Sequence, residues 1–296
     1  ARRDADFERL YAEHARPLLA FLTYRTGDPV LAEDLARCAR ELRETDDWKA
    51  VLDDLNEDHP RTPEEMRIGY ENWTERARVF LREHGLVSFP AGEECAVVPS
   101  PHFQRPVLAV ASYMQPPPFS DRMKGHFFVP FPPDGASDDE VQKRLASNSY
   151  PGIPTTAVHE AYPGHHLMRL YQHRNERPLR RWEKSYSDQG WCYYVEWELT
   201  PRPEYGFFPQ EMQDRYELEI LRLKLWRMGR VIIDSGLHTG EMSWDEAVTV
   251  ESERTGFVRR GAEINIDGIA GGGTDTAAPT IGYFQWMLLR EDYFNK

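Results

Sequence analysis

The centre of this chain reads His159-Glu160-Ala161-Tyr162-Pro163-Gly164-His165-His166, which places three imidazoles and one carboxylate in a single short segment. Imidazole is the preferred nitrogen ligand of zinc in proteins. A Glu directly after the first His is where many zinc peptidases keep their general base. In the HExxH pattern of those enzymes the second His comes four positions after the first, but position 163 here is Pro. We therefore interpret the segment as an interrupted form of that motif.

The interruption at Pro163 changes which imidazoles can meet. In an unbroken helix, His159 and His165 would lie on different faces, about 240° apart. Pro163 has no N–H to offer the carbonyl of His159 and its ring presses against that carbonyl, so the helix must kink or bulge there, and Gly164 lets the backbone follow. The segment thus predicts His159 and His165 as a pair of metal ligands, with His166 as the substitute for His165. The alternative is a His-rich turn whose hydrogen bonds are satisfied without a metal.

Helical periodicity dominates the sequence on both sides of this motif. Turn and cap residues such as Asp28 and Thr62 mark where helices begin, and Gly85 marks where one ends. We predict helices over 5–24, 29–42, 63–84, 210–233 and 243–253.

The section from 86 to 131 has a different character. Short runs of apolar, β-branched or aromatic residues, over 95–98, 107–113 and 127–129, are separated by Pro. Such runs are typical of short strands, and Pro is typical of sheet edges. We therefore predict a mainly α fold with a small antiparallel β-sheet, in the α+β class.

Composition limits the functions that are open to this chain. The 296 residues carry a net charge of −13, which repels nucleic acid. Cys38, Cys95 and Cys192 form neither an even disulfide set nor a CxxC pair, which fits a reducing compartment. Because the sequence has neither a long apolar run nor an apolar signal core, we expect no membrane association and a cytoplasmic location.

Two further segments, taken with the central one, resemble a known family. Residues Gly190-Trp191-Cys192-Tyr193-Tyr194-Val195-Glu196 and Asp234-Ser235-Gly236-Leu237-His238-Thr239-Gly240 are similar to characteristic segments of the bacterial domain of unknown function 885, or DUF885. That family is grouped with the gluzincin metallopeptidases. The resemblance covers about residues 40–296 and corresponds to the C-terminal, catalytic half of a usual member.

The resemblance implies a gluzincin-like architecture that holds one zinc ion. His159 and His165 would be ligands, and Glu160 would be the general base. The family has a Glu just before Gly190-Trp191, the natural third ligand, but this chain has Gln189. Either Gln189 or Glu196 therefore completes the site, or the site has lost its affinity for metal.

The resemblance also suggests residues that would stabilise the oxyanion in the reaction. His238 and Tyr283 are the candidates, with a capping role as the alternative for His238 and core packing for Tyr283. An edge strand near Phe127–Phe131 would bind an extended peptide.

The first 36 residues differ in kind from those that follow. They resemble the start of region 2 of extracytoplasmic-function sigma factors, and this resemblance stops near Ala36. We therefore predict two parts, a helical segment over 1–36 and a metallopeptidase-like domain over 37–296. The first 36 residues form no basic patch, so binding to DNA is not expected and binding to RNA polymerase is the weakest of our hypotheses.

Two functions follow from these patterns. The first is a zinc-dependent hydrolase of peptide or amide bonds, acting on a peptide or a small amide, with Glu160 as base. The second is a metal-free, non-catalytic member of the family that acts as a binding protein, because Gln189 has replaced the carboxylate ligand.

Overall fold

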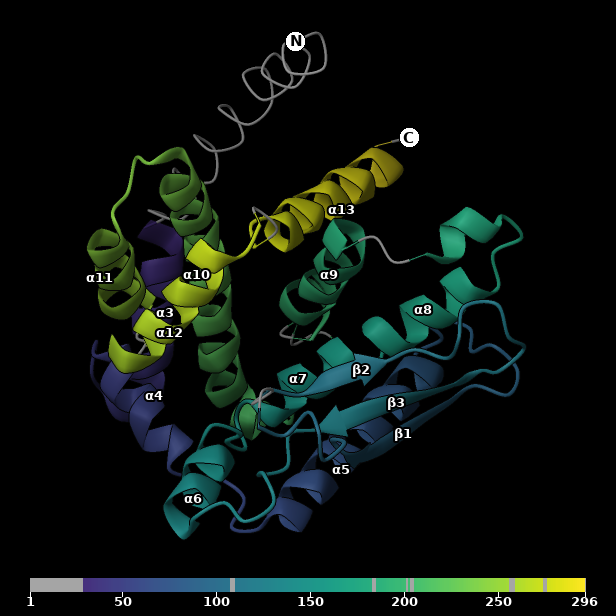
Figure 1. Cartoon of the computed structure of the whole chain (residues 1–296), viewed down its shortest axis with the longest axis horizontal. Coiled ribbons are helices and arrows are strands. Elements are labelled where there is room, and N and C mark those ends of the chain that lie inside the picture. Colours follow the sequence, from purple (N-terminus) through teal and green to yellow (C-terminus); the bar gives the residue numbers. More distant parts are fainter. Residues whose placement is uncertain are drawn as a thin grey trace, which may run out of the picture.

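The computed structural model describes residues 29–106, 110–182, 185–200, 202, 205–255, 259–273 and 276–295. The chain is mainly helical, with one three-stranded sheet in the described part (Figure 1). This agrees with the predicted α+β class. The helix expected over 5–24 lies outside the described residues.

The sheet is mixed, and the prediction of an antiparallel sheet was wrong in part. Its order is β1-β3-β2, formed by β1 (Glu94–Pro99), β3 (Lys124–Val129) and β2 (Ser112–Met114). β1 pairs with β3 in parallel, with Glu94 opposite Lys124, and only β2 runs antiparallel to β3. The expected edge at Phe127–Phe131 is also wrong, because Phe127 and Phe128 lie on the central strand. Apolar alternation indicates a strand but carries no information about its partner or direction.

Three helices pack near the sheet and build the main core (Figure 1). They are α5 (Pro63–Glu83), α7 (Ile153–Glu160) and α8 (His165–His173). α5 begins as predicted, since the Thr62 side chain accepts a hydrogen bond from the N–H of Glu65 at 3.1 Å, and Gly85 follows its end with a φ of 59°. Tyr70 of α5 meets Phe127 of β3 edge to face at 5.3 Å. This contact joins α5 to the central strand.

A second group of helices gathers around the long helix α10 (Gln213–Thr239) (Figure 1). It comprises α3 (Pro29–Arg43), α4 (Trp48–Asn56), α11 (Trp244–Thr255) and α12 (Arg259–Gly271). Two small apolar cores hold it together, one where α3 and α4 meet Leu218 and one where α11 and α12 meet Ile233. The helix predicted over 29–42 is confirmed by α3. That helix continues through residue 36, the predicted boundary between the two parts, and residues 1–28 of the first part lie outside the described residues.

The helix pair α9 (Ser185–Tyr194) and α13 (Ala278–Phe294) lies between these two groups (Figure 1). The two helices approach so closely that there is no room for a side chain at Gly190 of α9 or at Gly282 of α13. A Cβ atom on Gly282 would lie 1.7 Å from the carbonyl oxygen of Tyr186, and one on Gly190 would lie 2.3 Å from the carbonyl carbon of Gly282. These two glycines therefore set the position of α9, which carries part of the site described below.

The remaining short elements connect these groups. They are α6 (Asp138–Ala146), the 3-10 turns η2 (Pro178–Arg181) and η5 (Gln210–Met212), and the π-helical turn η3 (Val195–Leu199) that continues α9. Among the described residues, no helix is both long enough and apolar enough to cross a membrane.

Candidate metal centre

The predicted interruption at Pro163 is present, as a complete break between two helices rather than a bulge within one. α7 ends at Glu160 and α8 begins at His165. The N–H of Gly164 donates to the carbonyl of Val158 at 3.0 Å, and a Cβ at position 164 would lie 1.9 Å from the His159 carbonyl oxygen. Gly164 is thus the residue that allows the chain to turn back tightly over the end of α7.

This break brings His159 and His165 together. Their ring centroids are 4.8 Å apart with the planes nearly perpendicular, and both side chains are buried. Burial lowers the pKa of His165 well below its usual value, so its ring is neutral and able to offer a lone pair. Two imidazoles at this separation can bind one cation.

His166 points elsewhere. Its Nε2 donates to the Glu93 carboxylate at 3.2 Å, and the Tyr113 hydroxyl lies 3.0 Å from its Nδ1. Both ring nitrogens are therefore engaged away from His159. The structure favours His165 over His166 as the partner of His159.

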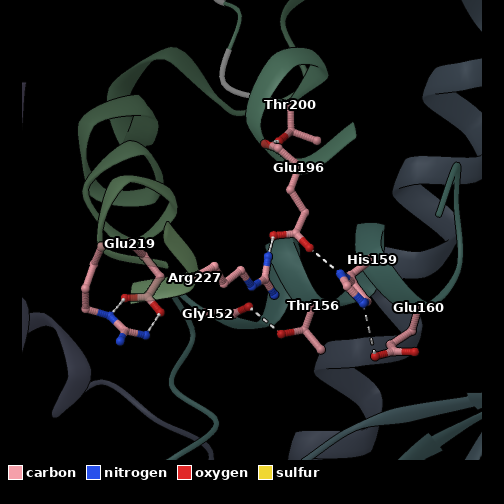
Figure 2. A network of polar contacts seen from close by, with 9 residues as sticks. Gly152, Thr156, His159, Glu160, Glu196, Thr200, Glu219 and Arg227 are labelled. Atoms are coloured by element: carbon pink, nitrogen blue, oxygen red, sulfur yellow. Dashed lines mark hydrogen bonds and ion pairs between the residues drawn. The ribbon is translucent and has the colours of Figure 1, made fainter. Parts of the chain in front are cut away.

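Glu196 contacts His159 on the Nδ1 side of its ring (Figure 2). One carboxylate oxygen accepts a hydrogen bond from Nδ1 of His159, and the other accepts one from Arg227. Burial alone would raise the pKa of Glu196, but the charges of Arg227 and His159 outweigh it and lower that pKa. Because the carboxylate occupies Nδ1, it fixes the tautomer that leaves Nε2 of His159 with its lone pair free. Glu196, one of the two candidates for third ligand, thus orients His159 in this structure.

Glu160 lies on the other side of His159, with a carboxylate oxygen 4.0 Å from Nε2 (Figure 2). The side chain is buried, and burial is the main reason that its pKa rises to about 7. The nearby negative charge of Glu196 raises this pKa further, whereas His159 and Arg227 oppose the rise. A carboxylate that titrates near neutral pH is suited to accept and return a proton.

A pocket of about 230 Å³ opens beside these residues. The edge strand β2 and its neighbours form one wall with Ala111, Ser112, Tyr113 and Gln115. Helices α7, α8 and α9 supply the other lining residues, which are Glu160, His165, Arg169 and Gln189. Tyr113 can lie there because Gly125 on the adjacent strand leaves room for its ring, whose hydroxyl would be 2.1 Å from a Cβ at position 125. The pocket gives a ligand access to Glu160 and His165.

α9 presents two further groups to the pair of imidazoles. Gln189 lines the pocket and forms a hydrogen bond with His165. Cys192, one turn later, is fully buried, and its sulfur and one nitrogen from each of His159 and His165 all lie within 4.8 Å of one another. Cys192 was not predicted as a site residue, because the three cysteines form neither a disulfide set nor a CxxC pair. Its spacing of three from Gln189, which puts both residues on one helix face, was a usable signal.

Tyr113 and Arg169 are two other pocket residues that the sequence analysis did not identify. Tyr113 belongs to a three-residue strand, and Arg169 is an Arg on a helix with an ordinary amphipathic pattern. Arg169 forms a buried ion pair with Asp188 at 2.6 Å. Neither residue carries a local motif, so only the tertiary structure identifies them.

His238 and Tyr283, the predicted oxyanion donors, are not among the residues that line the pocket. His238 pairs with Asp234 at 2.8 Å and lies eleven residues after Arg227 on α10, about 16 Å further along the helix. The Tyr283 ring packs on Trp197 at 4.7 Å, and its hydroxyl donates to Glu198 at 2.7 Å. These contacts agree with the alternatives to an oxyanion role, which were a capping role for His238 and core packing for Tyr283.

A family model described as bacterial protein of unknown function (DUF885) matches residues 23–296. The chain belongs to the DUF885 family. The match begins inside the segment that we assigned to a separate N-terminal part. No curated protein matches the chain in sequence.

Two solved structures show the same fold as this DUF885 chain. One is described as a putative lipoprotein of unknown function from Shewanella oneidensis, with 18% identity over 94% of this chain and a TM-score of 0.80. The other is the putative lipoprotein from Colwellia psychrerythraea, with 19% identity over 88% of this chain and a TM-score of 0.71. The match covers 50% and 43% of those two chains, so the chain spans about half the length of these structural relatives.

The donor set of this DUF885 chain fits a zinc ion. Zinc in proteins takes four donors in a tetrahedron, with Zn–N of about 2.0 Å and Zn–S of about 2.3 Å, so the donor atoms lie roughly 3.3–3.6 Å apart. The two imidazoles and the Cys192 sulfur lie within 4.8 Å of one another, so these three donors are close enough to surround one ion.

Proposed function

We propose that this chain is a zinc-dependent hydrolase of peptide or amide bonds, with His159 and His165 as metal ligands and Glu160 as general base. One observation carries the proposal. The break between α7 and α8 directs two buried imidazoles to one point, next to a buried carboxylate with a pKa of about 7, at the wall of a pocket.

In this proposal the ion and the residues of the chain make separate contributions to the reaction. A bound zinc ion supplies a Lewis acid that polarises a carbonyl group and makes water more acidic. Glu160 accepts the proton of the attacking water on a carboxylate oxygen and passes it to the leaving amine. Glu196 keeps His159 in one tautomer, with Nε2 toward Glu160. The small pocket, with β2 as its wall, positions the substrate against Glu160.

Glu160→Gln tests the proposal. The substitution keeps the shape of the side chain but removes its capacity to accept a proton, so we expect hydrolysis of a mixed peptide library to fall roughly 100- to 10,000-fold. Metal analysis should find about one zinc ion per chain in both proteins, because the ligands are unchanged. Glu241→Gln, at an exposed position, is the matched control and should keep full activity.

Two outcomes would contradict this proposal. Full activity in the Glu160→Gln protein with its zinc retained would exclude Glu160 as base. Wild-type protein that binds no zinc when the metal is supplied would favour the second function, a metal-free binding protein, which the exchange of the expected Glu for Gln189 supports.

The cytoplasmic location also stays a proposal. The two structural relatives are described as putative lipoproteins, and that description applies to them. Fractionation of cells that express the tagged natural protein would test the location.

A further inference from the structure

We propose that Cys192 is a ligand of the metal, so that the centre is built from two imidazoles and a thiolate. This inference rests on the proposed function, because it concerns the same ion. The inference goes beyond the proposed function because it assigns Cys192 as the third metal ligand, in place of Gln189 and Glu196, the two candidates suggested by the sequence.

Position is the first argument for Cys192. α9 runs past the two imidazoles, and residues three apart on a helix share one face. Gln189 lines the pocket, and Cys192, one turn later on the same face, has its sulfur within 4.8 Å of a nitrogen of His159 and of His165. The described residues contain two groups of His, Cys, Asp or Glu donors close enough to hold an ion, and one of them is His159, His165 and Cys192.

Charge balance is the second argument. A divalent ion held by two neutral imidazoles and the neutral Gln189 would keep its full charge in a buried site, which is costly. Two of the nearby carboxylates are already engaged. Glu196 pairs with Arg227 and His159, and Asp188 pairs with Arg169. A Cys192 thiolate supplies a negative ligand and leaves Glu160 available as base.

The surroundings of the thiol are the third argument. Cys192 is fully buried, yet it belongs to none of the three apolar clusters formed by the described residues. Cys38, by contrast, is buried inside the small core of α3 and α4. A buried thiol close to two imidazoles is placed as a zinc ligand would be, and thiolate and imidazole are common donors in protein zinc sites.

Cobalt substitution tests the proposal without any substrate. Cobalt(II) reports a bound thiolate through an intense sulfur-to-metal charge-transfer band in the near ultraviolet. We expect this band in the wild-type chain loaded with cobalt and in Cys38→Ala, the matched control. The band should be absent from Cys192→Ala and Cys192→Ser.

Zinc affinity, measured by competition with a chromophoric chelator, gives a second readout. Loss of partners that only support a ligand lowers metal affinity roughly 10- to 100-fold, so loss of a ligand should lower it by more than about 100-fold. Gln189→Ala, which keeps the thiol, should keep the band and lose less affinity. Circular dichroism of the metal-free variants establishes that they are folded, and the wild-type spectrum answers the question even if Cys192→Ala does not fold.

The possible failures are distinct. Wild-type protein that binds cobalt without the band would overturn the role of Cys192 and leave the hydrolase proposal standing. A large loss of affinity in Gln189→Ala, with none in Cys192→Ala, would assign the third position to Gln189. A wild-type chain that binds neither cobalt nor zinc would overturn both proposals.

Discussion

At the scale of single residues, the site depends on two carboxylates, Glu196 and Glu160, that have different roles. Glu196 and Glu160 both lie within contact of His159, but Glu196 faces Nδ1 and Arg227 whereas Glu160 faces Nε2 and the pocket. Their pKa values move in opposite directions, since a buried cation lowers the pKa of Glu196 and burial raises that of Glu160. Two buried carboxylates thus take different roles because of their neighbours.

Glu196→Gln should weaken the metal centre without removing a ligand. The amide can still contact His159 but no longer balances Arg227, so we expect zinc affinity to fall roughly 10- to 100-fold. The unpaired buried guanidinium should also lower the free energy of unfolding by about 3–5 kcal/mol. Chelator competition and urea denaturation measure the two effects.

Glu198→Gln is the matched control for this change, since it lies on the same π-helical turn and contacts Tyr283 instead. Equal zinc affinity in the Glu196→Gln and Glu198→Gln proteins would contradict the role that we assign to Glu196.

At the scale of elements, the close pairing of α9 with α13 is what holds Gln189 and Cys192 against the two imidazoles. The pairing depends on the absence of side chains at Gly190 and Gly282. Ordinary helix packing, with interaxial distances of about 8–10 Å, would leave α9 further from α13. Helix α13, which is distant in sequence from His159 and His165, therefore sets the position of the helix that faces them.

Gly282→Ala should separate α9 from α13. The new methyl group would meet the Tyr186 carbonyl at 1.7 Å, so we expect a loss of about 1–3 kcal/mol in the free energy of unfolding, together with weaker zinc binding. Gly268→Ala is the control, because it lies on helix α12 with open space around it and should be neutral or stabilising by about 0.5–1 kcal/mol. Thermal denaturation in the presence and absence of zinc measures both. Equal stability of the two variants would show that the pairing tolerates a side chain.

At the scale of the whole molecule, one buried carboxylate links the parts that surround the site. Glu93, just before β1, accepts hydrogen bonds from Arg78 of α5 at 2.8 Å, from Tyr162 at 2.5 Å and from His166 of α8 at 3.2 Å. Burial alone would raise the pKa of Glu93, but the bonds from His166, Tyr162 and Arg78 outweigh it and lower that pKa to about 2.

This network makes a prediction about stability and pH. The pKa of Glu93 is lower in the folded chain than its ordinary value of 4.5, so its contribution is fully present above about pH 4.5 and is lost as the pH falls toward about 2. At neutral pH, Glu93→Gln should therefore cost roughly 2–3 kcal/mol of unfolding free energy. The difference from wild type should shrink as urea denaturation is repeated at lower pH. A difference that stays constant across this range would contradict the assignment.

The chain by itself determined much about this protein. The helical patterns at 29–42 and 63–84, the existence of a small sheet and the break at Pro163 all follow from local spacing and from the geometry of Pro and Gly. The approach of His159 to His165 was also predictable, because both residues flank that break and their meeting depends on nearby backbone alone.

Only the tertiary structure decided the remaining features. The parallel pairing of β1 with β3, the location of His238 and Tyr283 outside the pocket and the arrival of Cys192 beside the imidazoles involve segments distant in sequence. Their positions depend on how helices and strands pack. The close contact of Gly190 with Gly282, for example, joins two residues that are far apart in the sequence and that no local pattern connects. Local periodicity reports which face of an element is buried, whereas the partner of that face is set by packing of the whole chain.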